Sequence, residues 1–233
     1  MIWTMLLWLW VSFISTMDDV KVYHVKKVAS DFEISGKGEQ EIWNQAALLT
    51  DFRLPWDKTL AQPTSFRALW TDNFYYFFYD VIDLDIVAPG EARNQLNVLP
   101  SDRIEIFFKA NGQMSPYYCL EMDPKGRVLD YLARYYRDTD FDWEWPENEL
   151  EVKASIKKDG YMVEGKISLN SLRDLQLLAD DHSMDVGLFR GDFYHLNASK
   201  TDVRWISWVS PESEKPDFHI PSAFGKLVLE QNQ

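Results

Sequence analysis

The segment from Ser101 to Ala110, SDRIEIFFKA, combines charged and aromatic side chains in a pattern that could bind a ligand. Its β-branched and aromatic residues predict a strand, and successive side chains of a strand point to opposite faces. One face therefore carries only apolar residues, Ile104, Ile106 and Phe108, and the other carries a mixed set, Arg103, Glu105, Phe107 and Lys109. A carboxylate beside a phenyl ring on one sheet face predicts a polar group on a partly apolar platform, which is typical of a ligand site.

Sugars are bound by aromatic rings that lie against their C–H faces and by carboxylate, amide or Arg groups that bond their hydroxyls. Glu105 and Arg103 could do this together with Glu121 and Phe218, which lie in later segments. The alternative is that Arg103 and Glu105 form an exposed ion network across strands, a common feature of protein surfaces. These four residues are the first candidate binding site.

Two further aromatic candidates, Trp143 and Trp145, flank Glu144 in the acidic and aromatic segment Tyr135–Asn148. This segment has no clean period, and its length predicts a surface loop that carries function. Two rings two residues apart could contact a ligand. The alternative is that they cover an edge of the core, as large aromatic side chains usually do.

Closely spaced carboxylates in two segments could bind a calcium ion, namely Asp80, Asp83 and Asp85, and Asp138, Asp140 and Asp142. Calcium prefers oxygen ligands, and a spacing of two residues brings alternate acids together in a loop. The Gly and the closing Glu of an EF-hand loop are absent, so a solvated acidic segment is the competing interpretation. Structural calcium is therefore kept as a candidate cofactor, with its ligands unassigned.

Carboxylate pairs could also act as acid and base on a glycosidic bond, and the candidates are Asp102 with Glu105 and Glu121 with Asp123. If one strand carries Glu121 and Asp123, they lie about 7 Å apart on one face, which suits an inverting glycosidase. An acidic β protein offers many such spacings, however, so hydrolysis remains an alternative to binding.

The bulk composition limits the class of partner. With 24 Lys and Arg against 37 Asp and Glu, the formal net charge of the 233 residues is −13. Nucleic acids and anionic membranes require clustered basic residues, so both are disfavoured. Cys119 is the only cysteine, which excludes an intramolecular disulfide, and we expect it to be a small buried apolar side chain.

The first 15 residues, MIWTMLLWLWVSFIS, form an apolar run without charge. The run is shorter than the roughly 20 residues of a membrane-spanning helix and fits the apolar part of a secretory signal. It lacks a preceding Lys or Arg and a clear cleavage site, so an uncleaved anchor and a true start at Met17 are alternatives. We expect residues 1–19 to be a signal peptide, residues 20–233 to form one domain, and the protein to be secreted, periplasmic or at the cell surface.

Short strands with regular turn signals run through residues 20–233. Hairpins are expected at Asp72-Asn73, Asn111-Gly112 and Asp159-Gly160, because these pairs favour tight turns. Helical spacing of apolar residues predicts short helices over residues 39–47 and 169–178. Together these elements predict an all-β fold, an antiparallel β-sandwich of jelly-roll type with one or two short helices.

Six segments, in order along the chain, resemble those of the family 9 carbohydrate-binding modules, within the wider group of DOMON-like sandwiches. They are FEISGKGEQEIWNQA, FRALWTDNFYYFFYDVID, SDRIEIFFKA, YYCLEMDPKGRVLD, GYMVEGKISLNSL and WISWVSPESEKPDFHIPSAFGKLVL. The resemblance covers roughly Phe32 to Leu229 and closes on the Pro-x-x-Phe-Gly run at Pro221 to Gly225.

The resemblance implies a cleft that holds the end of a sugar chain between two Trp rings, beside charged and amide groups. One ring position falls near Leu99, where the Trp is missing, and the other falls at Phe218, which retains a smaller ring. The family glutamate corresponds to Glu105. A basic and an amide position correspond roughly to Cys119 and Glu121, so that pair is changed. Some members of the family also bind structural calcium.

The function that the resemblance implies is non-catalytic binding of a glycan or oligosaccharide, for example from xylan, in a secreted polysaccharide-degrading system. A separate glycoside hydrolase would be a partner. The first alternative is a haem-binding DOMON-like domain, for which Met114, Met122 and His195 are candidate iron ligands, although no spacing pairs them. The second alternative is that the chain is itself a glycoside hydrolase.

Overall fold

The computed structural model describes residues 20–90 and 95–231. The expected signal peptide, residues 1–19, lies outside the described residues. Among those residues, no helix has the length and apolar character that a membrane crossing would require.

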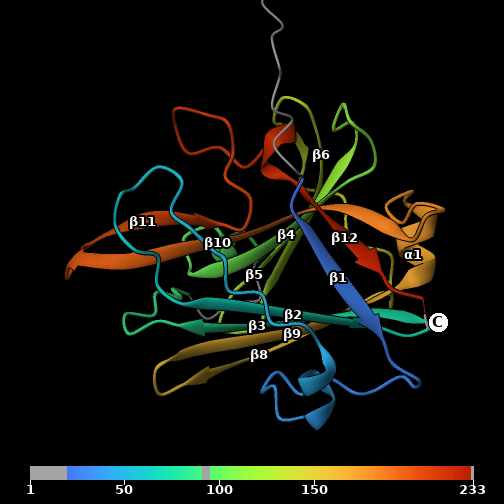
Figure 1. The fold of residues 1–233 in the computed structure, drawn as a ribbon. Coiled ribbons are helices and arrows are strands. Elements are labelled where there is room, and N and C mark those ends of the chain that lie inside the picture. The colour runs from blue at the N-terminus through green and yellow to red at the C-terminus, as the bar shows by residue number, and fades with distance from the viewer. Residues whose placement is uncertain (1–19, 91–94, 232–233) are drawn as a thin grey trace, which may run out of the picture.

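The strands form two sheets that pack face to face (Figure 1). The first sheet runs in the order β7 (Asp138–Asp140), β6 (Val128–Arg134), β5 (Tyr117–Met122), β4 (Arg103–Lys109), β10 (Ser183–Asn197), β12 (Gly225–Leu229) and β1 (Val22–Lys27), with β11 (Lys200–Ser207) also paired to β10. The second sheet continues from β1 through β2 (Thr64–Trp70), β3 (Phe74–Ile82), β9 (Gly160–Ser168) and β8 (Leu150–Lys157).

The predicted all-β sandwich is confirmed, with one addition to its topology. Most neighbouring strands are antiparallel, but β1 pairs in parallel with both β12 and β2. β1 therefore joins the two sheets at one side of the sandwich. The short helices are α1 (Leu169–Asp174) and the 3₁₀ turns η1 (Glu41–Gln45), η2 (Gln95–Val98) and η3 (Pro221–Ala223). The segment expected as a loop over residues 135–148 contains the short edge strand β7.

Strand alternation sorts the side chains of β4 as expected. Ile104, Ile106 and Phe108 are fully buried in the apolar core between the sheets. Phe107, on the opposite face, belongs to a second apolar cluster with Cys119, Phe189 and Phe218. The segment after β11 covers this outer face of the first sheet, and the candidate site lies there. Cys119 is completely buried, as expected for a small apolar side chain.

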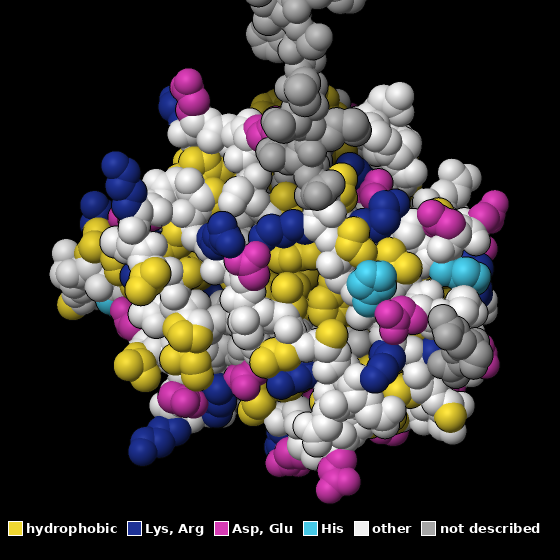
Figure 2. Space-filling view, in the orientation of Figure 1, with side chains coloured by type: hydrophobic (Ala, Val, Ile, Leu, Met, Phe, Trp, Pro, Cys, Tyr) yellow, Lys and Arg dark blue, Asp and Glu magenta, His cyan; other side chains and the backbone are white. Residues whose placement is uncertain are grey.

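The molecular surface is mixed in character. On the face shown in Figure 2, basic, acidic and hydrophobic side chains are interspersed, and no large basic patch is visible on that face.

Candidate functional site

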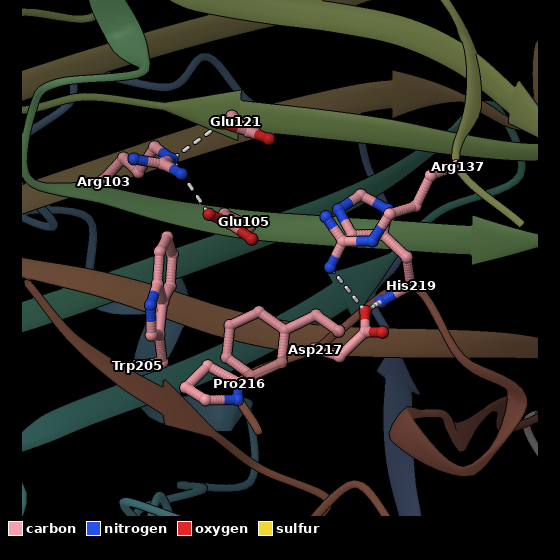
Figure 3. A pocket seen from close by; sticks show the side chains of 9 residues that line it. Arg103, Glu105, Glu121, Arg137, Trp205, Pro216, Asp217 and His219 are labelled. Atoms are coloured by element: carbon pink, nitrogen blue, oxygen red, sulfur yellow. Dashed lines mark hydrogen bonds and ion pairs between the residues drawn. The ribbon is translucent and has the colours of Figure 1, made fainter. Parts of the chain in front are cut away.

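A pocket of about 170 Å³ opens on the outer face of the first sheet (Figure 3). Strands β4, β5 and β11 provide one part of its wall, and the segment before η3 provides another. Its lining consists of charged and aromatic side chains, namely Arg103, Glu105, Glu121, Arg137, Trp205, Pro216, Asp217, Phe218 and His219. We call this site the Arg103 pocket. It contains four of the six binding residues proposed from the sequence.

Arg103 links two carboxylates at the back of the pocket. Glu105 and Glu121 lie opposite each other in the β4–β5 pairing, so their side chains share a face. Arg103 Nε lies 2.9 Å from Glu105 Oε1 and 2.7 Å from Glu121 Oε2. All three side chains are at most 6% exposed. The ion network of Arg103, Glu105 and Glu121 is therefore buried, and the exposed network considered as the alternative does not form.

The remaining contacts of this network fix its orientation. Arg103 Nη1 donates to Leu99 O at 2.8 Å, and the Tyr131 hydroxyl donates to Glu121 Oε1 at 2.8 Å. In Figure 3, the second oxygen of Glu105 turns away from Arg103 toward the middle of the pocket. The network can thus present a positioned carboxyl oxygen to a ligand hydroxyl.

Burial dominates the electrostatics of Glu105. Desolvation, together with the nearby Glu121 carboxyl, raises the pKa of Glu105 to about 8, although Arg103 opposes the shift. The Glu105 carboxyl is therefore able to donate a hydrogen bond near neutral pH as well as to accept one. Desolvation acts against the charge of Arg103, but Glu121 and Glu105 outweigh it and raise the pKa of the guanidinium.

Trp205 forms the aromatic wall of the pocket. It lies opposite Gly191 in the β10–β11 pairing, on the same face as Arg103. Its ring lies 5.3 Å from the centre of the Arg103 guanidinium. A Cβ at Gly191 would approach the Trp205 ring to 3.2 Å, so glycine leaves room for the indole.

Phe218, for which the resemblance implies a place in the sugar clamp, is only 5% exposed. It stacks on Phe189 with ring centroids 4.0 Å apart and planes inclined by 10°. Trp56 and Trp205 pack around it, with centroids 5.5 and 5.7 Å away. Phe218 therefore supports the floor of the pocket, and the half-buried Trp205 offers the more accessible ring.

Three polar residues that the sequence reasoning missed complete the opposite side. Asp217 Oδ1 accepts bonds from Arg137 Nη2 at 2.8 Å and from the backbone N–H of His219 at 2.9 Å. Its Oδ2 accepts from the Tyr136 hydroxyl at 2.6 Å. Although burial acts against it, these donors lower the pKa of Asp217.

His219 is a neutral polar group of the pocket. Burial, reinforced by the charge of Arg137, lowers its pKa to about 4. Its Nδ1 lies 2.8 Å from the Tyr117 hydroxyl, which leaves Nε2 as the second polar atom of the ring. Either tautomer can serve a ligand hydroxyl, because a hydroxyl both donates and accepts.

The structure does not bring Trp143 and Trp145 into the Arg103 pocket. Trp145 is 6% exposed and packs in the core between the sheets, where its Nε1 donates to Ser171 Oγ at 3.1 Å. Trp143 lies partly buried against Trp145 and Tyr118. The placement agrees with the alternative given for these rings, that they cover an edge of the core.

The carboxylates considered for calcium do not gather as the sequence spacing suggested. Asp80 pairs with Lys157 and Asp85 with His195, while Asp138, Asp140 and Asp142 are exposed. Asp83 instead joins two distant acids, and oxygens of Asp83, Asp102 and Asp192 lie within 4.8 Å of one another.

Arg190 supplies positive charge to this cluster. Its Nη2 lies 2.9 Å from Asp83 Oδ2 and 2.8 Å from Asp192 Oδ1. Asp102 accepts bonds from two backbone N–H groups, and burial followed by the charge of Asp83 raises its pKa to about 8. The guanidinium of Arg190 therefore already contacts Asp83 and Asp192, and Arg204 Nε lies 2.8 Å from Asp192 Oδ2. With these cations in place, the residues do not fit a divalent cation as they are arranged.

The residues named for the other functions are also dispersed. Met114 and Met122 are buried in different apolar clusters, and His195 is exposed beside Asp85. Asp102 belongs to the Arg190 cluster, and Asp123 binds Arg127. Neither proposed acid–base pair is present in the Arg103 pocket, which unites Glu105 with Glu121 instead.

Two local signals could have revealed the missed pocket residues. Arg137 follows two tyrosines at the start of the segment already expected to carry function. Asp217 and His219 flank Phe218, just before the Pro-x-x-Phe-Gly run. Trp205 has no such local signal, because its role depends on the pairing of β11 with β10.

Three solved structures share the fold of this chain. A candidate carbohydrate-binding protein from Bacteroides uniformis ATCC 8492 is 19% identical with a TM-score of 0.67, over 91% of this chain and 100% of that one. A family 9 module from Caldicellulosiruptor kristjanssonii in complex with glucose is 20% identical with a TM-score of 0.58, over 91% of this chain and 97% of that one. A family 9 module from the same organism in complex with cellotriose is 18% identical with a TM-score of 0.54, over 91% of this chain and 95% of that one.

Among curated proteins, no relative of the chain is found. The family comparison gives a match over residues 34–232, which is most of the 233-residue chain and ends beyond β12. The chain therefore belongs to the carbohydrate family 9 binding domain-like family, CBM9.

Proposed function

We propose that the Arg103 pocket binds one sugar ring at the end of a glycan, without cleaving it. The observation that carries this proposal is the buried Arg103–Glu105–Glu121 network beside the accessible ring of Trp205. An aromatic face and fixed hydrogen-bonding groups are the two features that sugar recognition requires.

The size and charge of the pocket narrow the ligand. Its volume of about 170 Å³ is below the roughly 300–1,000 Å³ of pockets for drug-sized ligands, which favours a single ring. Two guanidinium groups face three carboxyl groups, so the lining has no excess of positive charge for an acidic sugar. We therefore infer a neutral sugar, and the glucose and cellotriose bound by the similar modules make glucose-based glycans the first probes.

The geometry favours binding over hydrolysis. Arg103 contacts both carboxylates, and Tyr131 bonds Glu121 as well. Each of the two acids is therefore already bonded to protein groups, and these bonds would have to be released before the pair could act as acid and base.

We place this binding activity in a secreted polysaccharide-degrading system, with a separate glycoside hydrolase as partner. Support comes from the apolar N-terminal run and from the family, whose members bind carbohydrate.

A neutral glycan array followed by titration calorimetry tests the proposal. We expect the purified protein to bind at least one neutral glycan, and Trp205→Ala to weaken binding about tenfold or more, because an aromatic anchor at the centre of a site contributes most of its energy. Trp143→Ala is the matched control and should leave the affinity unchanged. Absence of binding on the array, or equal loss in both variants, contradicts the proposal, and release of reducing sugar would favour a hydrolase.

A further inference from the structure

A second cavity, of about 260 Å³, adjoins the Arg103 pocket and shares two wall residues with it, Trp205 and Pro216. Figure 3 shows these two residues together at one side of the first pocket. The lining of the second cavity includes Tyr194, Asp202 and Arg204 from β10 and β11, and Trp56 and Asp57 from the segment before β2. We call it the Tyr194 cavity.

The Tyr194 cavity lies along the outer edge of β11. Tyr194 and Asp202 are opposite each other in the β10–β11 pairing and share one sheet face. Trp205 is on the other face, because it lies an odd number of residues from Asp202. A cavity lined from both faces must pass around the edge of the strand, so a ligand there can continue from the Arg103 pocket past Trp205.

We propose that the Tyr194 cavity binds the second residue of a neutral oligosaccharide whose terminal residue occupies the Arg103 pocket. This inference rests on the proposed function of the Arg103 pocket. The shared wall supports it, because Trp205 and Pro216 line both cavities.

The lining of the Tyr194 cavity has the chemistry that a sugar needs. Trp56, Tyr194 and Trp205 supply rings, and the exposed carboxylates of Asp57 and Asp202 can accept bonds from hydroxyls. A hydrogen bond from the Thr59 N–H lowers the pKa of Asp57, so this carboxylate stays ionised.

Two of these side chains are held in place before any ligand binds. Trp56 Nε1 donates to Ser213 O at 2.9 Å, and its ring packs on Phe218. The Arg204 guanidinium lies 4.6 Å from the Tyr194 ring centre, and its Nε lies 2.8 Å from Asp192 Oδ2. Preorganised groups lose less conformational entropy when a ligand binds.

The charges of the Tyr194 cavity select against acidic sugars. The Arg204 cation is already paired with the buried Asp192. Asp57 and Asp202 therefore give the cavity a negative rim. A carboxylate or sulfate on the second sugar would be repelled there, whereas neutral hydroxyls would donate to the same oxygens.

Calorimetry with glucose, cellobiose and cellotriose, and with xylose, xylobiose and xylotriose, tests the inference on the full chain. In the series that binds, we expect the disaccharide to bind about tenfold more tightly than the monosaccharide. Tyr194→Ala should remove most of this gain in affinity and change monosaccharide affinity less than twofold. Tyr194→Phe should retain the gain. Asp202→Asn, at an exposed site, should reduce the gain in the same direction if Tyr194→Ala does not fold.

Two controls separate this inference from the proposed function. Ile156→Ala, in β8 of the second sheet, removes an exposed side chain that lines neither cavity and should alter no affinity. Digalacturonic acid should bind no more tightly than the neutral monosaccharide. Equal affinity for mono- and disaccharide, or equal weakening of both by Tyr194→Ala, overturns the inference while the proposed function stands. Failure of every sugar to bind overturns both.

Discussion

Arg103 is the residue on which the charge balance of the pocket depends. It contacts Glu105, Glu121 and the Leu99 carbonyl, and its guanidinium also lies over Trp205. A buried ion network adds little net stability when complete, but removal of one member leaves uncompensated charge at a buried position. Arg103 therefore stabilises the fold and shapes the binding site at once.

Arg103→Met should lower the free energy of unfolding by about 3 kcal/mol or more, because it leaves the buried carboxyl groups of Glu105 and Glu121 without their cation. Arg137→Met is the matched control, since Arg137 is 46% exposed. Its loss should cost less than about 1 kcal/mol, as expected for an exposed pair. Urea unfolding at neutral pH measures both, and equal effects would show that the Arg103 network is not buried as described.

Glu105 should make the protein less stable as the pH rises from about 5 to 9. Its folded pKa of about 8 lies above its ordinary value of 4.5, so its stabilising contribution is complete below pH 4.5 and is lost as the pH rises through 8. Asp102, with a pKa of about 8, acts in the same direction. In urea unfolding from pH 5 to 9, Glu105→Gln should therefore flatten part of the slope. Glu39→Gln, an exposed control, should keep the wild-type slope, and an unchanged slope in Glu105→Gln contradicts the assignment.

At the scale of elements, β10 connects the site to the rest of the sheet. It pairs with β4, β11 and β12, and its Phe189 carries the stacked ring of Phe218. Gly187 allows this arrangement, because a Cβ there would lie 2.4 Å from the Phe189 ring. The position of the pocket floor thus depends on Gly187, which lies two residues before Phe189 in β10.

Gly187→Ala should lower the free energy of unfolding by about 1–3 kcal/mol, as other overpacking substitutions do. It should also weaken sugar binding, because displacement of Phe189 moves Phe218 and the neighbouring Asp217 and His219. Gly112→Ala is the control, since no atom lies within 4 Å of the added Cβ. Calorimetry combined with urea unfolding separates the two effects, and intact affinity in Gly187→Ala would show that β10 does not set the pocket.

At the scale of the whole molecule, β1 holds the two sheets together through its parallel pairing with β12 and β2. Tyr23 completes this junction. Its hydroxyl donates to Ala47 O at 2.6 Å and accepts from the Ala68 N–H at 3.0 Å. Because apolar side chains of both sheets form one core, we expect the described residues to unfold as one cooperative unit.

Tyr23→Phe should lower the free energy of unfolding by about 1–3 kcal/mol, since it leaves a buried backbone N–H without its partner. The thermal transition should stay single and move to lower temperature. Tyr135→Phe, at an exposed position, is the control and should not shift the transition. Two separate transitions in either protein would contradict the closure of both sheets around one core.

The sequence was sufficient to predict the parts of the site that depend on local alternation. Arg103 and Glu105 share a face of β4 because they are two residues apart, and Glu121 follows in the adjacent hairpin strand. Local alternation could not show that Trp205 lines the pocket and Trp143 does not, because both lie in segments that mix polar and aromatic residues. Long-range pairing with Gly191 places Trp205 at the pocket, and packing against Tyr118 holds Trp143 elsewhere.

The parallel position of β1 and the Arg190 cluster could not be predicted from the sequence for the same reason. Each brings together segments that are distant in the chain, and local patterns contain no information on such contacts. The spacing of Asp80, Asp83 and Asp85 suggested one loop site, whereas the strand geometry directs the three carboxylates to different partners.

A crystal structure of the protein with the tightest neutral oligosaccharide from the array tests the central claim most directly. We expect a terminal sugar ring in the Arg103 pocket, with one face against Trp205 and hydroxyls within hydrogen-bond distance of Glu105 and His219. A sugar bound instead beside Trp143 and Trp145, with the Arg103 pocket free of ligand, would contradict the account.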